Sequence, residues 1–321
     1  MKTKITIATL FLLGFSAVNA QKYDIKTAKT YAEISAKTDG KWEGRKYIGG
    51  TVFKNVDELK LAPEHTDHSF DIRYEGPGWE SNKVGYRLYL DWRNAIDIFG
   101  KKTEDIILPQ VGQDNFDSYH NMSDWGADIL KAGKGIGIGS IDRYLNNEKL
   151  HFREVDSTIA KVENKTNESV VKVRYYGWKT ASDKIDFTSE LTIKPDQLYT
   201  QHTIKASKEI KGICTGIVKQ KNTELLKKES KNKKWAYLAT YGQQSLVPDK
   251  LGMALFYEVK TIESVEDTVL DYLLVFKPTT KATSFYLLGA WEQQKDGIKT
   301  QEEFVQYLDQ KLEVLNKKGK L

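Results

Sequence analysis

The sequence predicts a mostly β protein, a large antiparallel β-sandwich that ends in one C-terminal helix. Two observations predict the sheets: several segments alternate between apolar and polar residues, and residues typical of turns separate them. A third observation predicts the helix, because near the C-terminus the apolar residues change to a spacing of three and four. Strands of this length and number favour packed antiparallel sheets.

The first clear strand is Val84 to Trp92, whose alternation would put Arg87, Tyr89, Asp91 and Arg93 on one face. A later pair, Phe187 to Ile193 and Leu198 to Lys205, is joined by turn residues and predicts an antiparallel hairpin. Further strands are predicted at Val170 to Trp178, Trp235 to Tyr241, Met253 to Lys260, Val269 to Lys277 and Ser284 to Trp291.

The helix is predicted over Glu302 to Lys317. Thr300 can cap its first turn, and Glu303 completes a capping box three residues later. Lysines near its end suit the negative end of the helix dipole. No repeat or linker interrupts the chain, so residues 21–321 are expected to form a single carbohydrate-active β-sandwich domain.

The N-terminus predicts export. Lys2 and Lys4 precede an apolar run from Ile5 to Val18, and small residues before Gln21 form a cleavage site, so residues 1–20 are interpreted as a signal peptide. No cysteine lies near that junction, which argues against a lipoprotein anchor, and no later stretch is apolar enough to span a membrane. A periplasmic location is expected.

The composition narrows the partners. The formal net charge is +5, from 49 lysines and arginines against 44 acids. Export and the absence of a recognition motif argue against nucleic acid, whereas an anionic glycan suits a mildly basic exported protein. The single cysteine, Cys214, is expected to be a small buried side chain. The oligomeric state stays open.

The face shared by Arg87, Tyr89 and Arg93 is the first candidate binding site. Two arginines flanking a tyrosine could hold a carboxylate or a sulfate through paired hydrogen bonds. A solvated sheet face with an internal ion pair is the alternative.

His120 is the main candidate for acid–base chemistry. It follows Tyr119 and lies near Asp124 and Asp128, in a polar segment that could supply proton transfer, although it could equally hold a loop in place. His202 shares a face with apolar residues, so it is either a core histidine or a reserve base. His65 and His68 have a spacing that could bind a metal but lack an obvious third ligand.

The glycine-rich segment Gly133 to Gly139 is not a nucleotide loop, because its glycines lack the required spacing and no Gly-Lys-Ser/Thr ending follows. It predicts a strand packed close to another backbone. Trp79 and Trp125, expected in loops, are the tryptophans predicted to offer flat platforms for sugar rings.

Long blocks of the chain resemble a known family. The segments Tyr74 to Arg87, Leu90 to Asp97, Asp117 to Gly126, Lys134 to Ser140 and Gly212 to Gly216 are similar to a secreted Bacteroidetes polysaccharide-utilisation family, formerly a domain of unknown function. The ulvan oligosaccharide dehydratase is one member type. By fold analogy, a sandwich of this size is expected to be a supersandwich of the mutarotase-like kind.

The resemblance implies a carbon–oxygen lyase. It would remove water from the non-reducing-end uronic acid of glucuronate/iduronate–rhamnose-3-sulfate oligosaccharides and leave a 4,5-unsaturated sugar. Such a reaction needs the carboxylate neutralised, a base for the C5 proton and an acid for the leaving hydroxyl.

The chemistry of this reaction assigns residues to these roles as hypotheses. Arg87 and Arg93 would hold the carboxylate, and Lys134 or Arg143 the sulfate. His120 or Tyr119 would transfer protons, with His202 in reserve. No cofactor is expected, and a divalent metal stays open.

Other functions stay open as well. A glycoside hydrolase using Asp117, Asp124 or Asp128, a mutarotase-like enzyme, and a glycan-binding protein without catalysis are the alternatives.

Overall fold

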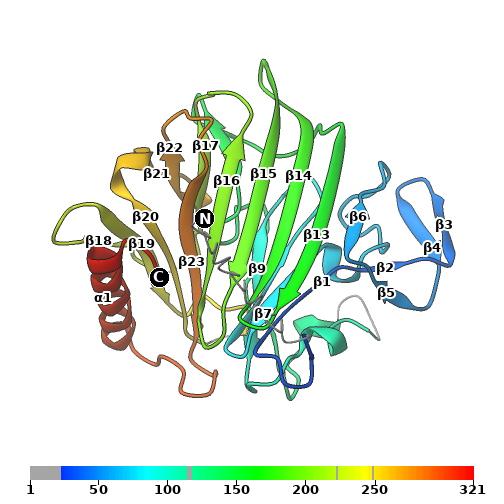
Figure 1. Ribbon diagram of the computed structural model, residues 1–321, viewed down its shortest axis with the longest axis horizontal. Helices are drawn as coiled ribbons and strands as arrows, with labels where there is room; N and C mark the ends of the chain where they lie inside the picture. Colours follow the sequence, from blue (N-terminus) through cyan, green and yellow to red (C-terminus); the bar gives the residue numbers. More distant parts are fainter. Residues whose placement is uncertain (1–22, 114–117, 222, 248) are drawn as a thin grey trace, which may run out of the picture.

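The computed structural model describes residues 23–113, 118–221, 223–247 and 249–321. The predicted signal peptide and Asp117 lie outside these residues. Two layers of antiparallel strands form the body of the molecule (Figure 1). The first layer is a nine-stranded sheet whose spatial order is β18 (Leu226–Glu229), β19 (Trp235–Gly242), β20 (Leu251–Glu258), β23 (Thr283–Trp291), β16 (Tyr199–Ala206), β15 (Asp183–Ile193), β14 (Glu168–Thr180), β13 (Ser157–Lys165) and β6 (Glu58–Lys60).

The second layer consists of two five-stranded sheets. The first has the order β1 (Thr30–Glu33), β7 (Gly78–Ser81), β8 (Val84–Leu88), β9 (Ile96–Lys101) and β10 (Gly126–Asp128). The second has the order β12 (Glu148–Leu150), β11 (Asp142–Leu145), β17 (Ile213–Val218), β22 (Asp271–Phe276) and β21 (Ile262–Asp267).

The glycine-rich segment joins these two sheets. Gly137 bridges to Ile96 of β9, and the next residue, Ile138, bridges to Ile217 of β17. The prediction of a close backbone approach is therefore confirmed, because a Cβ at Gly137 would lie only 2.1 Å from the Ile96 carbonyl oxygen. The segment forms isolated bridges rather than a regular strand.

Smaller elements flank the two layers. β2 (Ser35–Lys37) pairs with β5 (Phe53–Asn55), and β3 (Gly40–Glu43) forms a hairpin with β4 (Lys46–Gly49), at the end of the molecule away from α1 (Figure 1). The helix α1 (Gln301–Lys318) packs beside β19. The short 3₁₀ turns are η1 (Arg73–Glu75), η2 (Leu108–Gln110), η3 (Ser118–His120) and η4 (Val259–Thr261).

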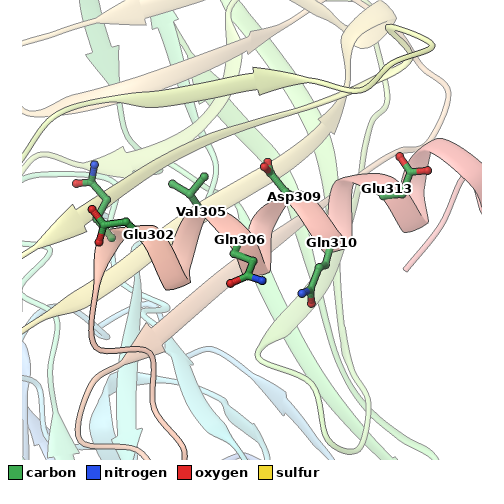
Figure 2. Close-up of a pocket in the computed structure, with 7 residues that line it drawn as sticks. Glu302, Val305, Gln306, Asp309, Gln310 and Glu313 are labelled. Atoms are coloured by element: carbon green, nitrogen blue, oxygen red, sulfur yellow. The ribbon is translucent and has the colours of Figure 1, made fainter.

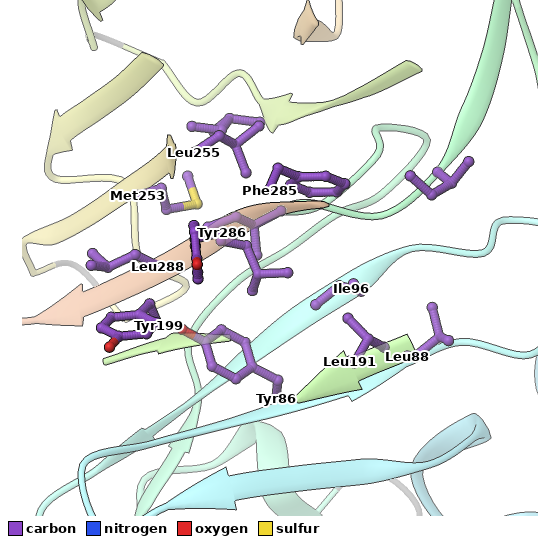
Figure 3. Packing of buried hydrophobic residues seen from close by; sticks show 14 of the residues in the cluster. Tyr86, Leu88, Ile96, Leu191, Tyr199, Met253, Leu255, Phe285, Tyr286 and Leu288 are labelled. Atoms are coloured by element: carbon purple, nitrogen blue, oxygen red, sulfur yellow. The ribbon is translucent and has the colours of Figure 1, made fainter. Parts of the chain in front are cut away.

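The core lies between the layers, and Figure 3 shows part of its packing. Ile96 and Tyr86 of the second layer meet Leu191, Phe285 and Leu288 of the first within one buried cluster. Tyr86 also donates a 2.6 Å hydrogen bond to the Leu198 carbonyl. One face of β8 and β9 therefore packs in the core, and their other face is directed away from the nine-stranded sheet.

The predicted fold class is confirmed: the protein is mostly β, its sheets are antiparallel, and its one α-helix in the described ranges lies at the C-terminus. The predicted hairpin of β15 and β16 pairs as expected, with Ile193 opposite Thr200. The capping box at Thr300 and Glu303 is present, and Gly319 ends the helix in the left-handed conformation.

One predicted strand is too long. The strand from Val84 ends at Leu88. The residues from Asp91 to Asn94, which include Trp92, form a turn instead of continuing the strand. The Asp91 side chain accepts a 2.8 Å hydrogen bond from the backbone N–H of Arg93, which is turn chemistry that competes with strand pairing. Alternation alone does not reveal that competition.

Replacing Gly137 by alanine should destabilise the protein by about 2 kcal/mol or more. The residue has φ +69°, and the new Cβ would collide with the Ile96 backbone that joins the two sheets. Urea unfolding followed by tryptophan fluorescence measures the loss. Gly133→Ala is the matched control, since Gly133 has φ +58° but nothing within 4 Å of its Cβ position. If both variants lose the same unfolding free energy, the contact between Gly137 and the Ile96 backbone does not contribute to the destabilisation.

Candidate functional site

A cavity of about 380 Å³ opens on the outer face of the sheet that contains β8, β9 and β10. Its wall combines buried charged residues with a few exposed ones. The lining residues are His68, Glu75, Arg87, Tyr89, Arg93, Asp97, His120, Asp128, Leu130, Lys131, Ala132, Gly133 and Leu246.

Strand register brings the charged floor of this cavity together. Arg87 on β8 lies directly opposite Asp97 on β9, and Asp128 on β10 lies opposite Phe99, two residues beyond Asp97. Because side chains alternate along a strand, Asp97 and Phe99 share the face that the neighbouring isoleucines leave free. The same alternation that packs the core thus directs three charged groups outward.

The guanidinium of Arg87 is the centre of this cluster. Its Nη2 donates to Asp128 Oδ2 at 2.7 Å, to Asp97 Oδ2 at 3.1 Å and to the Tyr89 hydroxyl at 2.8 Å. Its Nη1 donates to the Tyr119 hydroxyl at 2.7 Å. Arg87 is only 2% exposed, so its charge is held by these partners rather than by water.

The surroundings of Asp97 change its pKa. Burial, reinforced by the negative charge of Asp128, raises the pKa of Asp97 to about 7. Its Oδ2 accepts from the Tyr89 hydroxyl. Burial likewise holds the pKa of Tyr89 well above its ordinary value. The cavity therefore contains a carboxyl group that can be protonated near neutral pH, next to a hydroxyl that keeps its proton.

His120 is the exposed partner of Asp128. Its Nε2 lies 3.2 Å from Asp128 Oδ2, and 37% of its side chain is exposed whereas only 1% of the Asp128 side chain is. An acceptor at that distance favours the tautomer with the proton on Nε2, which leaves the lone pair of the neutral ring on Nδ1. The geometry supplies an aspartate that orients a histidine at the mouth of a cavity.

Tyr119 has a different position from the one expected. It is 2% exposed and does not line the cavity, and its hydroxyl accepts from Arg87. Its ring supports His120, with 4.5 Å between the two centroids. Tyr89 is the tyrosine whose side chain lines the cavity.

Arg93 closes another side of the cavity. Its Nη2 donates to Asp67 Oδ1 at 2.8 Å and to Glu75 Oε1 at 3.1 Å, and it also pairs with Asp91. Its guanidinium carbon lies 4.2 Å from the centre of the Tyr89 ring. Both predicted arginines therefore reach the cavity, but each is already paired with carboxylates.

A group of possible metal ligands lies beside Arg93. Asp67, His68 and Glu75 offer ligand atoms within 4.8 Å of one another. The guanidinium of Arg93 already bridges the two carboxylates, and His68 Nδ1 lies 2.6 Å from Asp67 Oδ1, so these donors fit an arginine better than a metal ion. His65 is not part of the group; its Nδ1 lies 2.9 Å from a carboxylate oxygen of Asp71.

Other predicted site residues lie outside this cavity. Trp79 is fully buried on β7, where it stacks on Tyr86 and donates to Thr200, so it offers no sugar platform. Trp125 is half-buried and packs edge-on against Phe99.

His202 lies in the core on β16. It is 1% exposed, its Nδ1 lies 2.8 Å from the Gly139 carbonyl oxygen, and its Nε2 contacts the Ser189 hydroxyl. Burial lowers the pKa of His202 to about 4. It is a hydrogen-bonded core histidine outside the candidate cavity, and this position gives the reserve-base hypothesis no support.

The two residues expected to bind sulfate are also elsewhere. Arg143 is buried and donates to the carbonyls of Lys211 and Thr180. Lys134 is exposed but does not line the cavity, although its neighbour Gly133 does.

Sequence reasoning missed Asp97 and Glu75, and it gave Tyr89 no part in proton transfer. The signal for Asp97 is its position between two isoleucines, since an acid inside an apolar alternation marks a buried or specially paired carboxylate. The signal for Glu75 is its backbone conformation, which only the structure shows. Glu75 and Tyr74 both have positive φ, of 69° and 42°, which is strain of the kind that collects at functional sites.

A larger hollow, of about 790 Å³, runs along the outer side of α1 (Figure 2). Side chains of that helix alone line it, among them Glu302, Asp309 and Glu313. Its lining residues include neither a histidine nor a basic residue, so it lacks the paired opposite charges found around Arg87.

Comparison with known proteins now identifies the family. The model of the family described as "Domain of unknown function (DUF4861)" matches residues 6–320. The chain belongs to this family. The part of the expected resemblance that concerned a family of unknown function is thereby confirmed, whereas a particular activity is not. No curated protein matches the chain.

Solved structures with similar folds include three carbohydrate enzymes. A kojibiose phosphorylase from the human microbiome, described as putative, has 12% identity and a TM-score of 0.40, over 74% of this chain and 32% of its own. A putative aldose 1-epimerase from Klebsiella pneumoniae has 8% identity and a TM-score of 0.36, over 76% and 84%. A 4-alpha-glucanotransferase from Thermococcus litoralis has 12% identity and a TM-score of 0.34, over 70% and 40%. The chain thus spans only about a third of the first. Likenesses this distant assign no activity to the DUF4861 protein.

Among the residues that the structure describes, no helix has the length and apolar character needed to cross a membrane.

The core position of His202 predicts a pH-dependent stability. The unfolded chain protonates this histidine below about pH 6.5, while the folded protein does not until about pH 4. Stability is therefore fully present above pH 6.5, and about 3 kcal/mol is lost as the pH falls through that window.

His202→Gln should remove that contribution, because glutamine does not titrate. The difference in unfolding free energy between wild type and variant, measured in urea from pH 7 to pH 4, should change by the same amount. A difference that stays constant with pH would mean that His202 does not stay neutral in the folded protein.

Proposed function

We propose that this DUF4861 protein is an exported, periplasmic dehydratase acting on the non-reducing-end uronic acid of ulvan-type oligosaccharides, in which glucuronate or iduronate is joined to rhamnose 3-sulfate. The product would be a 4,5-unsaturated uronic acid. The observation that carries the proposal is one cavity holding an Asp128–His120 pair beside a protonatable Asp97 and Tyr89. The family resemblance of the sequence blocks supplies the substrate class.

The size of the cavity suits a terminal sugar. At about 380 Å³ it is near the lower end of small-molecule sites, which span roughly 300–1,000 Å³. A single ring with its substituents fills such a space, whereas an enzyme that cleaves within a chain needs an open groove for several sugars.

The reaction removes a proton from C5 and a hydroxyl group from C4. We assign C5 proton abstraction to Nδ1 of His120, since Asp128 holds the proton of the other ring nitrogen and stabilises the imidazolium that forms. The C5–H electron pair becomes the C4–C5 double bond as the C4–O bond breaks. The departing oxygen takes a proton and leaves as water.

We propose that Tyr89 donates the proton to the departing C4 oxygen and that Asp97 supplies a replacement proton to Tyr89. Tyr89 lines the cavity and keeps its proton, and its hydroxyl contacts Asp97. A proton on Asp97 can replace the one that Tyr89 donates, so no phenolate persists in a buried place. This assignment replaces the hypothesis that Tyr119 transfers protons.

The arginines have supporting roles in this proposal. Arg87 holds Asp97 and Asp128 in place, and its burial leaves it no room to bind a substrate carboxylate directly. The exposed Lys131, which also lines the cavity, is better placed to pair with that carboxylate, with Arg93 nearby.

Replacing His120 by alanine should lower the rate by at least about a hundredfold, because the base is lost. The measurement is absorbance near 230 nm on saturated uronic-acid–rhamnose-sulfate oligosaccharides, with mass spectrometry alongside. His202→Gln is the matched control, a histidine replaced outside the cavity, and it should keep nearly full turnover at pH 7.5. Near-wild-type turnover in His120→Ala would remove the assignment.

The products of the same assay discriminate between functions. Loss of one water without chain cleavage supports the dehydratase. Shorter chains with rising absorbance indicate a chain-cleaving lyase, and shorter chains without it indicate a hydrolase. A hydrolase has less support in the structure: Asp124 does not line the cavity, and Asp128 contacts both Arg87 and His120.

The activity should fall as the pH rises above about 7. Ionisation of Asp97, whose pKa is raised to about 7, removes the proton that replenishes Tyr89. In Asp97→Asn the alkaline fall in kcat should disappear, together with a lower plateau rate. A pH profile of kcat that is the same in the variant and the wild type would show that Asp97 does not supply the proton.

A further inference from the structure

A second cavity, of about 370 Å³, lies next to the candidate active site. Consecutive residues of one turn line both: Leu90, Asp91 and Trp92 line the second cavity, while Tyr89 and Arg93 line the first. The loop that contains His65 and His68 is also shared: His65 lines the second cavity and His68 lines the first. A short oligosaccharide seated in one cavity would therefore have the other within reach.

Three cations surround this second cavity. Arg45 comes from the β3–β4 turn, Lys60 from the end of β6, and Arg153 from the segment before β13. All three are exposed, and across residues 23–113, 118–221, 223–247 and 249–321 none of them forms an ion pair with an acid.

The acids that line the same cavity are already neutralised. Asp91 pairs with Arg93, and Asp156 lies 2.7 Å from the ammonium of Lys184. The second cavity is therefore positively charged, in contrast with the first, where each buried arginine is matched by carboxylates. A positive cleft next to an acid–base site suits an anionic substituent of the substrate.

The guanidinium of Arg153 lies over an aromatic ring. Its guanidinium carbon lies 4.2 Å from the centre of the Trp92 ring, and Trp92 in turn packs edge-on against His151, with 5.0 Å between centroids. Stacking on a ring uses the face of the guanidinium and leaves its in-plane N–H groups available. Such a group can donate two parallel hydrogen bonds to a sulfate or carboxylate.

An unsatisfied histidine atom in the wall also points to a ligand. The side chain of His65 is 1% exposed, and its Nε2 has no hydrogen-bond partner among the described residues. Since Nδ1 is satisfied by Asp71, Nε2 of the neutral ring is an acceptor that a sugar hydroxyl would fill. Phe152 and Tyr175 give the same cavity aromatic surface.

We propose that this cavity binds an anionic sugar unit, the one that follows the terminal uronic acid, through the stacked guanidinium of Arg153 together with Lys60 and Arg45. The proposal rests on the proposed function for its choice of oligosaccharide. It assigns the sulfate of that unit to residues on the far side of the Asp91–Arg93 turn, in place of Lys134 and Arg143.

The test measures binding without turnover. In a His120→Ala background, isothermal titration calorimetry is performed with the saturated, sulfated uronic-acid–rhamnose oligosaccharide. Arg153→Gln should weaken binding by about tenfold, because a charge-assisted contact is lost, and the double variant Arg153→Gln/Lys60→Gln should weaken it further. Arg174→Gln is the matched control: Arg174 is an exposed arginine on β14 that lines neither cavity.

Modified ligands identify the anion. Chemically desulfated oligosaccharide should bind about tenfold more weakly than the sulfated one and should be insensitive to Arg153→Gln. If carboxyl reduction instead has that effect, the bound anion is the carboxylate of a uronic acid, which the rhamnose sulfate unit lacks, and the inference is overturned. If the double variant binds both ligands as well as Arg174→Gln does, the inference is overturned.

The two proposals can fail separately. Binding that depends on Arg153, in a protein whose intact His120 produces no unsaturated sugar, would refute the dehydratase and leave the anion site. Turnover that depends on His120, with binding indifferent to Arg153 and Lys60, would refute the anion site alone.

Discussion

The buried guanidinium of Arg87 is the interaction on which the site depends. A charge removed from water is costly unless it is paired and hydrogen-bonded, and Arg87 meets that condition with two aspartates and two tyrosines. The two aspartates that pair with Arg87 have different surroundings. Asp128 contacts both Arg87 and His120, whereas Asp97 is pushed toward protonation by burial and by its neighbour. The ion pair of Arg87 and the contact with His120 thus share one carboxylate oxygen, Oδ2 of Asp128.

Strand alternation couples this cluster to the core. Ile96 and Ile98 face the nine-stranded sheet, so Asp97 and Phe99 must face the other way. A slip of one residue in β9 would bury Asp97 in the core and expose the isoleucines, so the core itself fixes the register of the site. Gly137 adds a second restraint, because it anchors β9 to the neighbouring sheet through the Ile96 backbone.

The parts of the fold that the sequence predicted correctly are those that depend on neighbouring residues in the chain. The hairpin of β15 and β16 and the capped helix α1 follow from alternation, turn residues and a capping box. The end of β8 could not be predicted, because the Asp91 turn competes with strand pairing and the alternation of residues continues through it. Trp79 was misplaced for a related reason: its glycine-rich flanks suggest a loop, yet they allow the backbone to pack closely inside the sheet.

Of the candidate site, the sequence revealed the residue types better than their partners. Arg87, Arg93 and His120 do reach one cavity, but the pairing of Arg87 with Asp97 and Asp128 depends on the register of three strands. Whether a cation is already paired with a carboxylate then decides whether it can bind an anionic substrate group. Arginines matched by buried carboxylates cannot easily bind another anion, since the anion would have to displace a partner that is already desolvated. Cations without such partners can, which is why an arginine that stacks on a tryptophan ring is better suited to hold an anionic sugar than the two arginines that sequence alternation singled out.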